Sequence, residues 1–362
     1  MKVAVLGCGT IGRGVVNILL DGVKGVELKK ILDKKEKFLP ELKDYYTNDV
    51  NEILNDKTID TVVETLGGKG FAYTCVKNAL LSGKNVVTAN KELVSYHLRE
   101  LMEIAEKNGV YLLFEASVGG GIPFIKTISQ LAEFNKTKSI VGILNGTTNY
   151  VLTKMQKENM DYASALRQAQ ELGFAEADPT ADVEGHDMVR KISILSMLAY
   201  KQNVSPDDVF SFGITGVTEE FIEKVNSDGY TLKFVCYSDD DGDNLEIGVQ
   251  PMLFKNDDVI ANINYENNIV RFDMKPNDAL TFIGKGAGRM PTATAIVADL
   301  TVIRDGGQHI IFEEKNNKKI GLNEKTVSAY VLSGEKTGLV ENASVSQIRN
   351  GGYDFYAIIY KE

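Results

Sequence analysis

A lysine and a carboxylate stand four residues apart in a stretch whose apolar residues recur at helical spacing. The spacing predicts a helix over residues 185–200, on which Lys191 precedes Ile194 and Leu195 by three and four positions and borders the buried face. Asp187 lies one turn earlier on the same side, so the two charged groups project together. A lysine beside a substrate carbonyl can protonate or stabilise a developing alkoxide. The alternative is a lysine whose stem lies along the core while its charge pairs at the surface.

An acidic segment directly precedes this helix. Residues 176–184 contain Glu176, Asp178, Asp182 and Glu184 and have no basic partner in that stretch. Charge runs of this kind are typical of solvated faces. Because the segment leads into the helix of Lys191, its carboxylates could also hold the ammonium group of a substrate. The sequence leaves both interpretations open.

A glycine-rich turn follows a strand predicted over residues 2–6 and opens a helix. The turn reads Gly7-Cys8-Gly9-Thr10-Ile11-Gly12. Its glycines let the backbone turn tightly and approach a pyrophosphate at the helix N-terminus, where free N–H groups and the helix dipole attract the anion. A purely steric turn from strand to helix is the simpler alternative.

An acidic residue at the end of the second predicted strand bears on the choice of dinucleotide. Asp33 follows Gly12 at the distance at which a carboxylate accepts hydrogen bonds from the ribose of NAD. Lys34 and Lys35 stand beside it and could instead neutralise the 2′-phosphate of NADP. Asp33 could also do no more than cap a turn. The sequence therefore predicts NAD or NADP and does not choose between them.

Two strand exits carry polar residues where ligands bind in an open α/β sheet, beyond the carboxyl ends of its strands. The exit at residues 62–68 includes Thr65 and closes with two glycines. At the exit over residues 86–92, Asn90 is positioned to cap a helix and Lys91 lies just inside it. A lysine there opposes the helix dipole, which indicates a ligand anion that compensates it. A solvated surface lysine is the alternative.

Three further segments combine glycines or capping residues with possible ligands. Glu115 precedes three consecutive glycines, where exposed carbonyls beside a carboxylate can bind a hard cation or the glycines can form a hinge. Residues 145–149 contain more capping residues than one helix needs. Residues 284–288 form a second glycine-rich lead into a helix, which could return the chain to the cofactor or act as a flexible cap.

The elements that position these residues change character along the chain. In the first half, short apolar runs alternate with helical patterns, which predicts βαβ units and a parallel sheet. The expected strands cover residues 3–6, 26–32, 61–66, 85–88, 111–115 and 139–144. Residues 230–274 instead alternate polar and apolar side chains between turns, which predicts an antiparallel sheet. The acidic turn at residues 239–243 fits a solvated hairpin better than a calcium loop.

The expected fold class is α/β, with a Rossmann-type doubly wound parallel sheet and an α+β domain whose sheet is mainly antiparallel. The expected domains are 1–132 for the dinucleotide, 133–285 for the substrate, 286–315 for a return to the first domain, and 316–362 for a tail of unknown role.

The composition excludes several classes of protein. The chain has 362 residues, of which 43% are hydrophobic, and its net charge of −10 would repel a nucleic acid. No apolar run approaches the roughly 20 residues that cross a bilayer, so a membrane protein is not expected. The three cysteines Cys8, Cys75 and Cys236 are too few and too widely spaced to staple the fold, which favours a reducing cytoplasm.

Several motifs in order resemble the homoserine dehydrogenase family over about residues 1–304. They are Thr88-Ala89-Asn90-Lys91-Glu92, Glu115-Ala116-Ser117-Val118-Gly119-Gly120-Gly121-Ile122-Pro123, Asn145-Gly146-Thr147-Thr148-Asn149-Tyr150, residues 173–185 and Gly284-Lys285-Gly286-Ala287-Gly288. The resemblance implies an NAD(P)-dependent oxidoreductase acting on CH–OH, which interconverts L-aspartate 4-semialdehyde and L-homoserine in threonine and methionine biosynthesis. It also implies a homodimer formed through the second domain.

The resemblance assigns roles residue by residue. Lys191 would be the catalytic acid and base, with Lys91 and Asp182 completing the catalytic group, and Glu176 and Asp187 would bind the substrate's amino group. The cofactor would lie against Gly7, Gly9, Thr10, Ile11, Gly12, Asp33, Thr65, Lys91 and Gly286. A monovalent cation, sodium, would bind at Glu115, Val118, Gly120 and Ile122. The residues after Arg304 are too few for a complete regulatory ACT domain.

Two rival functions make different demands on the residues. A thiol-dependent semialdehyde dehydrogenase needs a thiolate nucleophile, and Cys8, Cys75 and Cys236 are not expected at the site. A dinucleotide sensor without catalysis has no use for an amino-acid pocket, so Lys191 and its neighbouring carboxylates argue against it.

Overall fold

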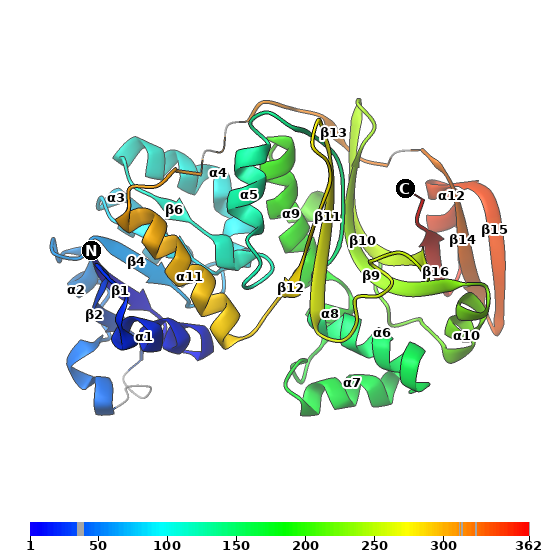
Figure 1. Ribbon diagram of the computed structural model, residues 1–362, viewed down its shortest axis with the longest axis horizontal. Coiled ribbons are helices and arrows are strands. Elements are labelled where there is room, and N and C mark those ends of the chain that lie inside the picture. The colour runs from blue at the N-terminus through cyan, green and yellow to red at the C-terminus, as the bar shows by residue number, and fades with distance from the viewer. Residues whose placement is uncertain (35–39, 311, 313, 323, 362) are drawn as a thin grey trace. The chain divides into compact units, whose positions relative to one another are not determined.

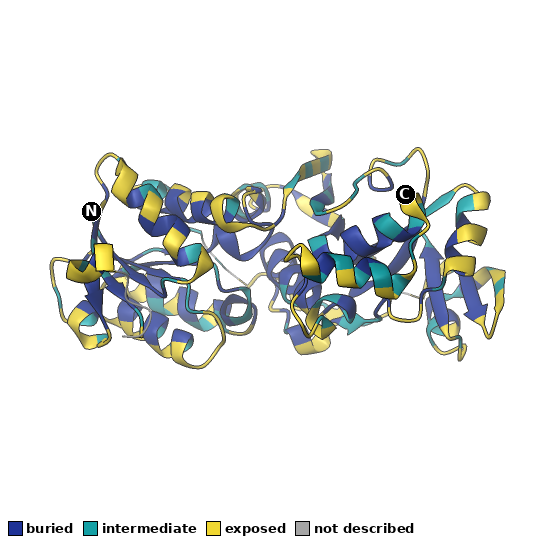
Figure 2. Ribbon diagram, turned by 90° about the horizontal axis from the view of Figure 1, so that it is seen from below, coloured by how far each residue is buried: buried dark blue, intermediate teal, exposed yellow. Residues whose placement is uncertain are grey.

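A computed structural model describes residues 1–34, 40–310, 312, 314–322 and 324–361. The chain divides into two compact units. Unit 1 comprises Met1–Glu133, Met197–Asn203 and Ala287–Lys315, and unit 2 comprises Phe134–Ser196, Val204–Gly286 and Asn316–Glu362. In each unit most strands are buried and the outward faces of the helices are exposed (Figure 2). Lys35, one of the two lysines that could favour NADP, lies outside the described residues.

Unit 1 is built on a six-stranded parallel sheet. Its strands are β1 Lys2–Leu6, β2 Glu27–Leu32, β3 Tyr46–Thr47, β4 Thr61–Glu64, β5 Asn85–Thr88 and β6 Leu112–Leu113. The strand order β3-β2-β1-β4-β5-β6 changes direction between β1 and β4. In doubly wound sheets, ligands bind beyond the carboxyl ends of the strands at this point. The predicted doubly wound sheet is confirmed. The prediction of a strand that includes Glu115 was wrong, because the chain turns into a short 3₁₀ helix there.

Helices connect these strands (Figure 1). They are α1 Thr10–Gly22, α2 Asn51–Leu54, α3 Phe71–Leu81, α4 Lys91–Asn108, α5 Phe124–Leu131 and α11 Arg289–Arg304, with the 3₁₀ helices η2 Pro40–Tyr45 and η3 Glu115–Ser117. Helix α11 comes late in the chain but shares the core of unit 1. Its residues Ala293, Ile296 and Leu300 belong to one apolar cluster with Val15 and Val16 of α1.

Unit 2 contains a ten-stranded, mainly antiparallel sheet. Its strands are β7 Lys136–Ile143, β8 Phe210–Ser211, β9 Tyr230–Asp240, β10 Asn244–Lys255, β11 Asn267–Lys275, β12 Asp278–Lys285, β13 Lys319–Ile320, β14 Thr326–Ser333, β15 Lys336–Ser344 and β16 Phe355–Ile359. The main path runs β12-β11-β7-β9-β10-β16-β14-β15, and β8, β13 and β16 pair with β10 in parallel. The acidic turn expected to be a hairpin joins β9 to β10.

Strand β7 corrects one prediction. Its apolar run matched the parallel strands of the first half, but it pairs antiparallel with β11 and β9 in unit 2. Its carboxyl end leads into α6, the helix that begins the candidate site.

The helices of unit 2 are α6 Gly146–Glu158, α7 Tyr162–Glu171, α8 Thr180–Val183, α9 His186–Tyr200, α10 Glu219–Ser227 and α12 Val345–Arg349, with the 3₁₀ helix η4 Pro206–Asp208. The last residues of α9 belong to unit 1. Among the helices of the described residues, none is both long and apolar enough to cross a membrane.

Candidate active site

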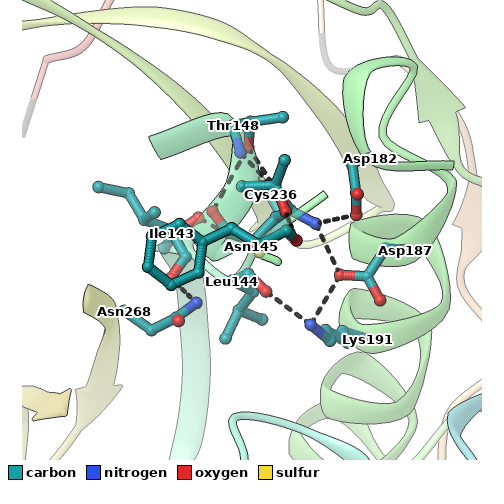
Figure 3. A network of polar contacts seen from close by, with 12 residues as sticks. Ile143, Leu144, Asn145, Thr148, Asp182, Asp187, Lys191, Cys236 and Asn268 are labelled. Atoms are coloured by element: carbon teal, nitrogen blue, oxygen red, sulfur yellow. Dashed lines mark hydrogen bonds and ion pairs between the residues drawn. The ribbon is translucent and has the colours of Figure 1, made fainter. Parts of the chain in front are cut away.

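Lys191 lies at the centre of a buried polar network in unit 2 (Figure 3). Its Nζ atom donates to the carbonyl oxygen of Leu144 and pairs with Oδ2 of Asp187, both at 2.7 Å. The two paired side chains are only 11% and 9% exposed. The helical spacing correctly predicted the pair beside the core, and the surface alternative is excluded by this burial.

Asn145 connects Lys191's partner to a second carboxylate. Its side-chain Nδ2 donates to Oδ1 of Asp182 at 2.7 Å and to Oδ2 of Asp187 at 3.1 Å. Its Oδ1 accepts from the backbone N–H of Thr148 at 2.9 Å and so caps α6. We did not predict a role for Asn145 in the site. The excess of capping residues over residues 145–149 was the signal that could have identified it.

The third predicted acidic residue lies apart from this network. Glu176 is exposed in the loop between α7 and α8, where its backbone carbonyl accepts from the side chain of Gln170. Asp182, on α8, is half-buried, and Asp187 is buried on α9. Of the three predicted acidic side chains, the structure therefore brings Asp182 and Asp187 together around Asn145 and leaves that of Glu176 out.

Cys236 borders the same network, contrary to the prediction that no cysteine lies at the site. It is fully buried on β9, and its thiol donates to the carbonyl oxygen of Gly142 at 3.4 Å. Burial raises the pKa of this thiol to about 12, so it stays protonated at neutral pH. A protonated, buried thiol is a poor nucleophile, which argues against a thiol-dependent dehydrogenase.

Gly286 lies against Asn268 in unit 2. A Cβ atom at this position would be 1.8 Å from Oδ1 of Asn268, whose Nδ2 donates to the carbonyl oxygen of Ile143 at 2.7 Å. Only glycine leaves room for Asn268 there. The second glycine-rich segment thus packs beside the carboxyl end of β7, next to Leu144.

In unit 1, the glycine turn is braced by two side chains predicted to contact the cofactor. Thr65 donates from Oγ1 to the carbonyl oxygen of Gly7 at 2.7 Å. The carboxylate of Asp33 accepts from the backbone N–H groups of Cys8 and Lys34, each at 2.8 Å. Helix α1 has no side-chain cap and no acidic residue in its first turn, so its N-terminal N–H groups are available to an anion.

Lys91 begins α4 at the carboxyl end of β5, as predicted. Asn90 caps this helix by accepting from the N–H of Leu93 at 3.1 Å, and its Nδ2 donates to the carbonyl oxygen of Gly68 at 2.6 Å. Lys91 is half-buried. The lysine and the glycines of the β4 exit therefore lie at one edge of the parallel sheet.

Glu64 is a buried carboxylate at this edge that we did not predict. It accepts from Oγ1 of Thr88 at 2.5 Å and from the N–H of Leu66 at 2.8 Å. Burial raises its pKa, although these hydrogen bonds oppose the shift. It holds the β4 exit in place, and its position in an apolar run, Thr61–Glu64, was the available signal.

The predicted cation ligands lie around η3 in unit 1. The Glu115 carboxylate accepts from the N–H groups of Ile125 and Lys126 at the start of α5, at 2.7 and 2.9 Å. The backbone N–H of Glu115 donates to buried Asp299 at 3.0 Å. Burial raises the pKa of both carboxyl groups.

The other predicted ligands, Val118, Gly120 and Ile122, are buried in the turn between η3 and α5. No group of three or more His, Cys, Asp or Glu side chains in the described part of the chain is placed to hold a metal. A cation here would therefore depend on main-chain carbonyls.

Two family models match most of the chain. The model described as "Homoserine dehydrogenase, NAD binding domain" matches residues 7–115, and the model "Homoserine dehydrogenase" matches residues 123–301.

Curated relatives agree with these matches. Homoserine dehydrogenase of Bacillus subtilis is 40% identical over 316 residues, which cover 84% of this chain and 72% of that protein. The Synechocystis enzyme is 39% identical over 315 residues, which cover 83% of this chain and 72% of that protein.

Solved structures extend the similarity over the full length. The crystal structure of S. aureus homoserine dehydrogenase at pH 6.0 has a TM-score of 0.83 and 31% identity, and covers 100% of this chain and 99% of that one. The Thiobacillus denitrificans enzyme has a TM-score of 0.88 and 27% identity, and covers 100% and 98%.

The fold, the NAD-binding match and these relatives describe an oxidoreductase that acts on the CH–OH group of an amino-acid substrate with a nicotinamide cofactor. The chain belongs to the homoserine dehydrogenase family.

Proposed function

We propose that Lys191 is the acid and base of the reaction between L-aspartate 4-semialdehyde and L-homoserine. The observation that carries this role is the buried pair of Lys191 and Asp187, which holds an ammonium group at a fixed position beside a polar network. Bound nicotinamide supplies or accepts the hydride. Lys191 donates a proton from Nζ to the oxygen that was the aldehyde carbonyl, and removes it in the reverse direction.

The neighbouring carboxylates select the substrate. Asp187 and Asp182 both approach Asn145, so they present two negative charges close to Lys191. The amino group of the substrate is a cation that such a pair attracts. Glu176 lies on an exposed loop, and its negative charge attracts the amino group of the substrate as it approaches the site. Lys91 acts as the second lysine and contacts the cofactor or the substrate.

The cofactor binds at the glycine turn of unit 1. The N–H groups of Gly9, Thr10, Ile11 and Gly12, at the N-terminus of α1, would hold its pyrophosphate, while Thr65 and Asp33 brace the turn beside Gly7. We propose that Gly286 is a further contact of the cofactor. Asp33 favours NAD through the ribose hydroxyl and Lys34 favours NADP through charge, so both cofactors remain candidates.

Steady-state assays of aspartate semialdehyde reduction with NADH and with NADPH test this function. We expect turnover with at least one cofactor, and the ratio of the two kcat/KM values ranks them. A protein that binds dinucleotide and turns over neither substrate pair would be a sensor, and the proposed reaction would then be wrong.

A sodium ion fits the turn after η3. Burial raises the pKa of Glu115 and Asp299, and a nearby cation would relieve the cost of keeping them charged. The carbonyls of Val118, Gly120 and Ile122 would hold the ion beside Glu115, where it would rigidify the turn. We expect Na⁺ to raise the melting temperature, and Glu115→Gln to abolish that rise while Glu103→Gln leaves it unchanged.

We also propose a cytoplasmic homodimer that forms through the sheet of unit 2. This sheet carries a groove of about 480 Å³ lined from β7, β9, β10, β11 and β16. A second copy of the chain is the occupant that we expect. Sedimentation equilibrium should give a dimer mass, and a monomer at micromolar concentration would contradict it.

A further inference from the structure

The side-chain amide of Asn145 uses its oxygen and its nitrogen for different hydrogen bonds. Its oxygen accepts from the N–H and Oγ1 of Thr148, at 2.9 and 3.0 Å, and thereby caps α6. Its nitrogen donates to the carboxylates of Asp182 and Asp187. The residue is only 4% exposed, so water cannot replace these contacts easily. Figure 3 shows the amide lying between the helix that it caps and the two carboxylates.

The arrangement places two like charges at the same nitrogen atom. Carboxylates this close repel each other, and one of them tends to take up a proton unless other groups stabilise both. Lys191 pairs with Asp187. The amide nitrogen contacts both acids and adds no net charge, because an NH₂ group offers two donors. An aspartate in its place would offer none when ionised.

We propose that Asn145 is a positioning residue, which holds the carboxylates of Asp182 and Asp187 together where they receive the ammonium group of the substrate. This inference rests on the proposed function. It separates two roles of one side chain: the oxygen stabilises the start of α6, and the nitrogen sets the geometry of the substrate's binding site.

Asn145→Asp removes the amide nitrogen and keeps the oxygen that caps α6. Aspartate has the same shape and caps helices as well as asparagine, so the bond from Thr148 is retained. The donor group is replaced by a third carboxylate. We expect KM for homoserine to rise about 10- to 100-fold, since each lost bond is to a charged group, while kcat changes less. We also expect the acidic limb of the kcat/KM pH profile to move to higher pH, because three clustered carboxylates cannot all ionise readily.

Asn145→Ser tests the same nitrogen without adding charge. Serine can cap the helix but is too short to reach both acids, so we expect the rise in KM without the shift of the pH profile. Asp161→Asn is the matched control. Asp161 caps α7 in the same unit by accepting from the N–H of Ser164 at 2.9 Å, and this exchange should leave both quantities as in the unaltered protein.

The outcomes separate this inference from the proposed function. If the unaltered enzyme turns over homoserine and both Asn145 variants keep its KM, the positioning role is wrong and the function stands. If the unaltered enzyme shows no turnover, the proposed function itself fails. If Asn145→Asp does not fold, the KM of Asn145→Ser decides, and an unchanged value overturns the role.

Discussion

At the scale of single residues, the site depends on a buried ion pair. Lys191 and Asp187 lie one helical turn apart on α9, and both are almost inaccessible to solvent. Taking two charges out of water is costly, and the cost is offset only while both partners and their hydrogen bonds are present. Removal of one partner therefore leaves the other charge buried without its counter-ion.

Asp187→Asn should lower the free energy of unfolding by about 3 kcal/mol, because it leaves Lys191 buried without its counter-ion. Chemical denaturation at pH 7 measures this change. Glu103→Gln is the control, since it breaks an i,i+4 pair with Arg99 in which the side chains are 66% and 57% exposed. Exposed pairs contribute about 0–1 kcal/mol. Equal losses in the two variants would show that burial of the Lys191 pair has no energetic consequence.

The sequence predicted this pair but not the amide beside it. Helical spacing alone places Lys191 and Asp187 on one side of a helix. The excess of capping residues over residues 145–149 gave no partner for Asn145, because its contacts with Asp182 and Asp187 span 37 and 42 residues. Local patterns do not contain such pairings. Cys236 was missed for the same reason, since only the strand pairing of β9 with β7 brings it to Gly142.

At the scale of elements, the turn from β1 to α1 shows how two glycines differ. A Cβ atom on Gly12 would lie 1.8 Å from the carbonyl oxygen of Gly7, which belongs to the same turn. A Cβ atom on Gly9 would meet no protein atom within 4 Å. Gly12 thus allows the strand and the helix to pack closely, and Gly9 leaves space at the N-terminus of α1.

Gly12→Ala should therefore destabilise unit 1 and lower its melting temperature, whereas Gly9→Ala should leave the melting temperature nearly unchanged. Gly9→Ala should still weaken dinucleotide binding, because the added methyl group occupies the space where the pyrophosphate approaches. Thermal denaturation and dinucleotide titration measure the two effects. A stable Gly12→Ala protein, or a Gly9→Ala protein with full affinity, would contradict this division.

Lys233 on β9 links three parts of unit 2 and has no exposed surface. Its Nζ donates to the carbonyl oxygen of Ile263 at 2.5 Å and to the side chain of Asn149 on α6 at 3.3 Å. Burial lowers the pKa of this lysine to about 7, and the charge of Lys157 adds to the shift. Between pH 7 and 10 the unfolded chain therefore binds a proton at this site that the folded chain does not.

The free energy of unfolding should accordingly rise with pH in this window, by about 2 kcal/mol between pH 7 and 9 from Lys233 alone. Lys233→Met should lose this rise. Lys255→Met, which removes an exposed lysine of β10, should keep it. Urea denaturation at the two pH values provides the measurement, and parallel slopes for Lys233→Met and the unaltered protein would refute the assignment.

Most elements of unit 1 were predictable, because buried parallel strands leave continuous apolar runs between helical patterns. The same signal gave a wrong prediction for β7. Its apolar run indicated a further parallel strand, but β7 belongs to the antiparallel sheet of unit 2. Glu115 was placed in a strand because the apolar residues 111–114 precede it, but the chain turns into η3 at Glu115 itself.

At the scale of the whole molecule, the last 47 residues of unit 2, Asn316–Glu362, extend its sheet. Strand β16 pairs in parallel with β10, and its residues Phe355, Tyr356 and Ala357 are buried. Arg349 of α12 forms an ion pair with Glu246 at 2.7 Å, with both side chains 8% exposed. The segment read as a tail of unknown role contributes strands and core to the unit.

A chain that ends at Lys315 should fail to fold cooperatively in unit 2, because it loses β16 and exposes the apolar partners of that strand. Circular dichroism during heating and binding of a hydrophobic dye report this loss. A chain that ends at Tyr360 is the control and should melt as the full chain does. An unchanged melt after truncation at Lys315 would show that the segment is an independent appendage.

This segment was not predictable because its strands have no distinctive pattern. Strand β15 alternates weakly and is mostly exposed, and its neighbour β14 is joined to β16 only through long-range pairing. The broad division into a parallel and an antiparallel sheet needed only composition and periodicity, whereas the place of residues 316–362 needed the three-dimensional structure.

The most direct test of the account is the turnover number of Lys191→Ala, measured beside its affinity for the dinucleotide. Lys191 lies in unit 2, and the glycine turn lies in unit 1, so the two properties depend on different residues. We predict that kcat falls by about 100-fold or more while the dissociation constant of the dinucleotide changes little. A variant that turns over homoserine at the rate of the unaltered protein would contradict the assignment of Lys191 as the acid and base.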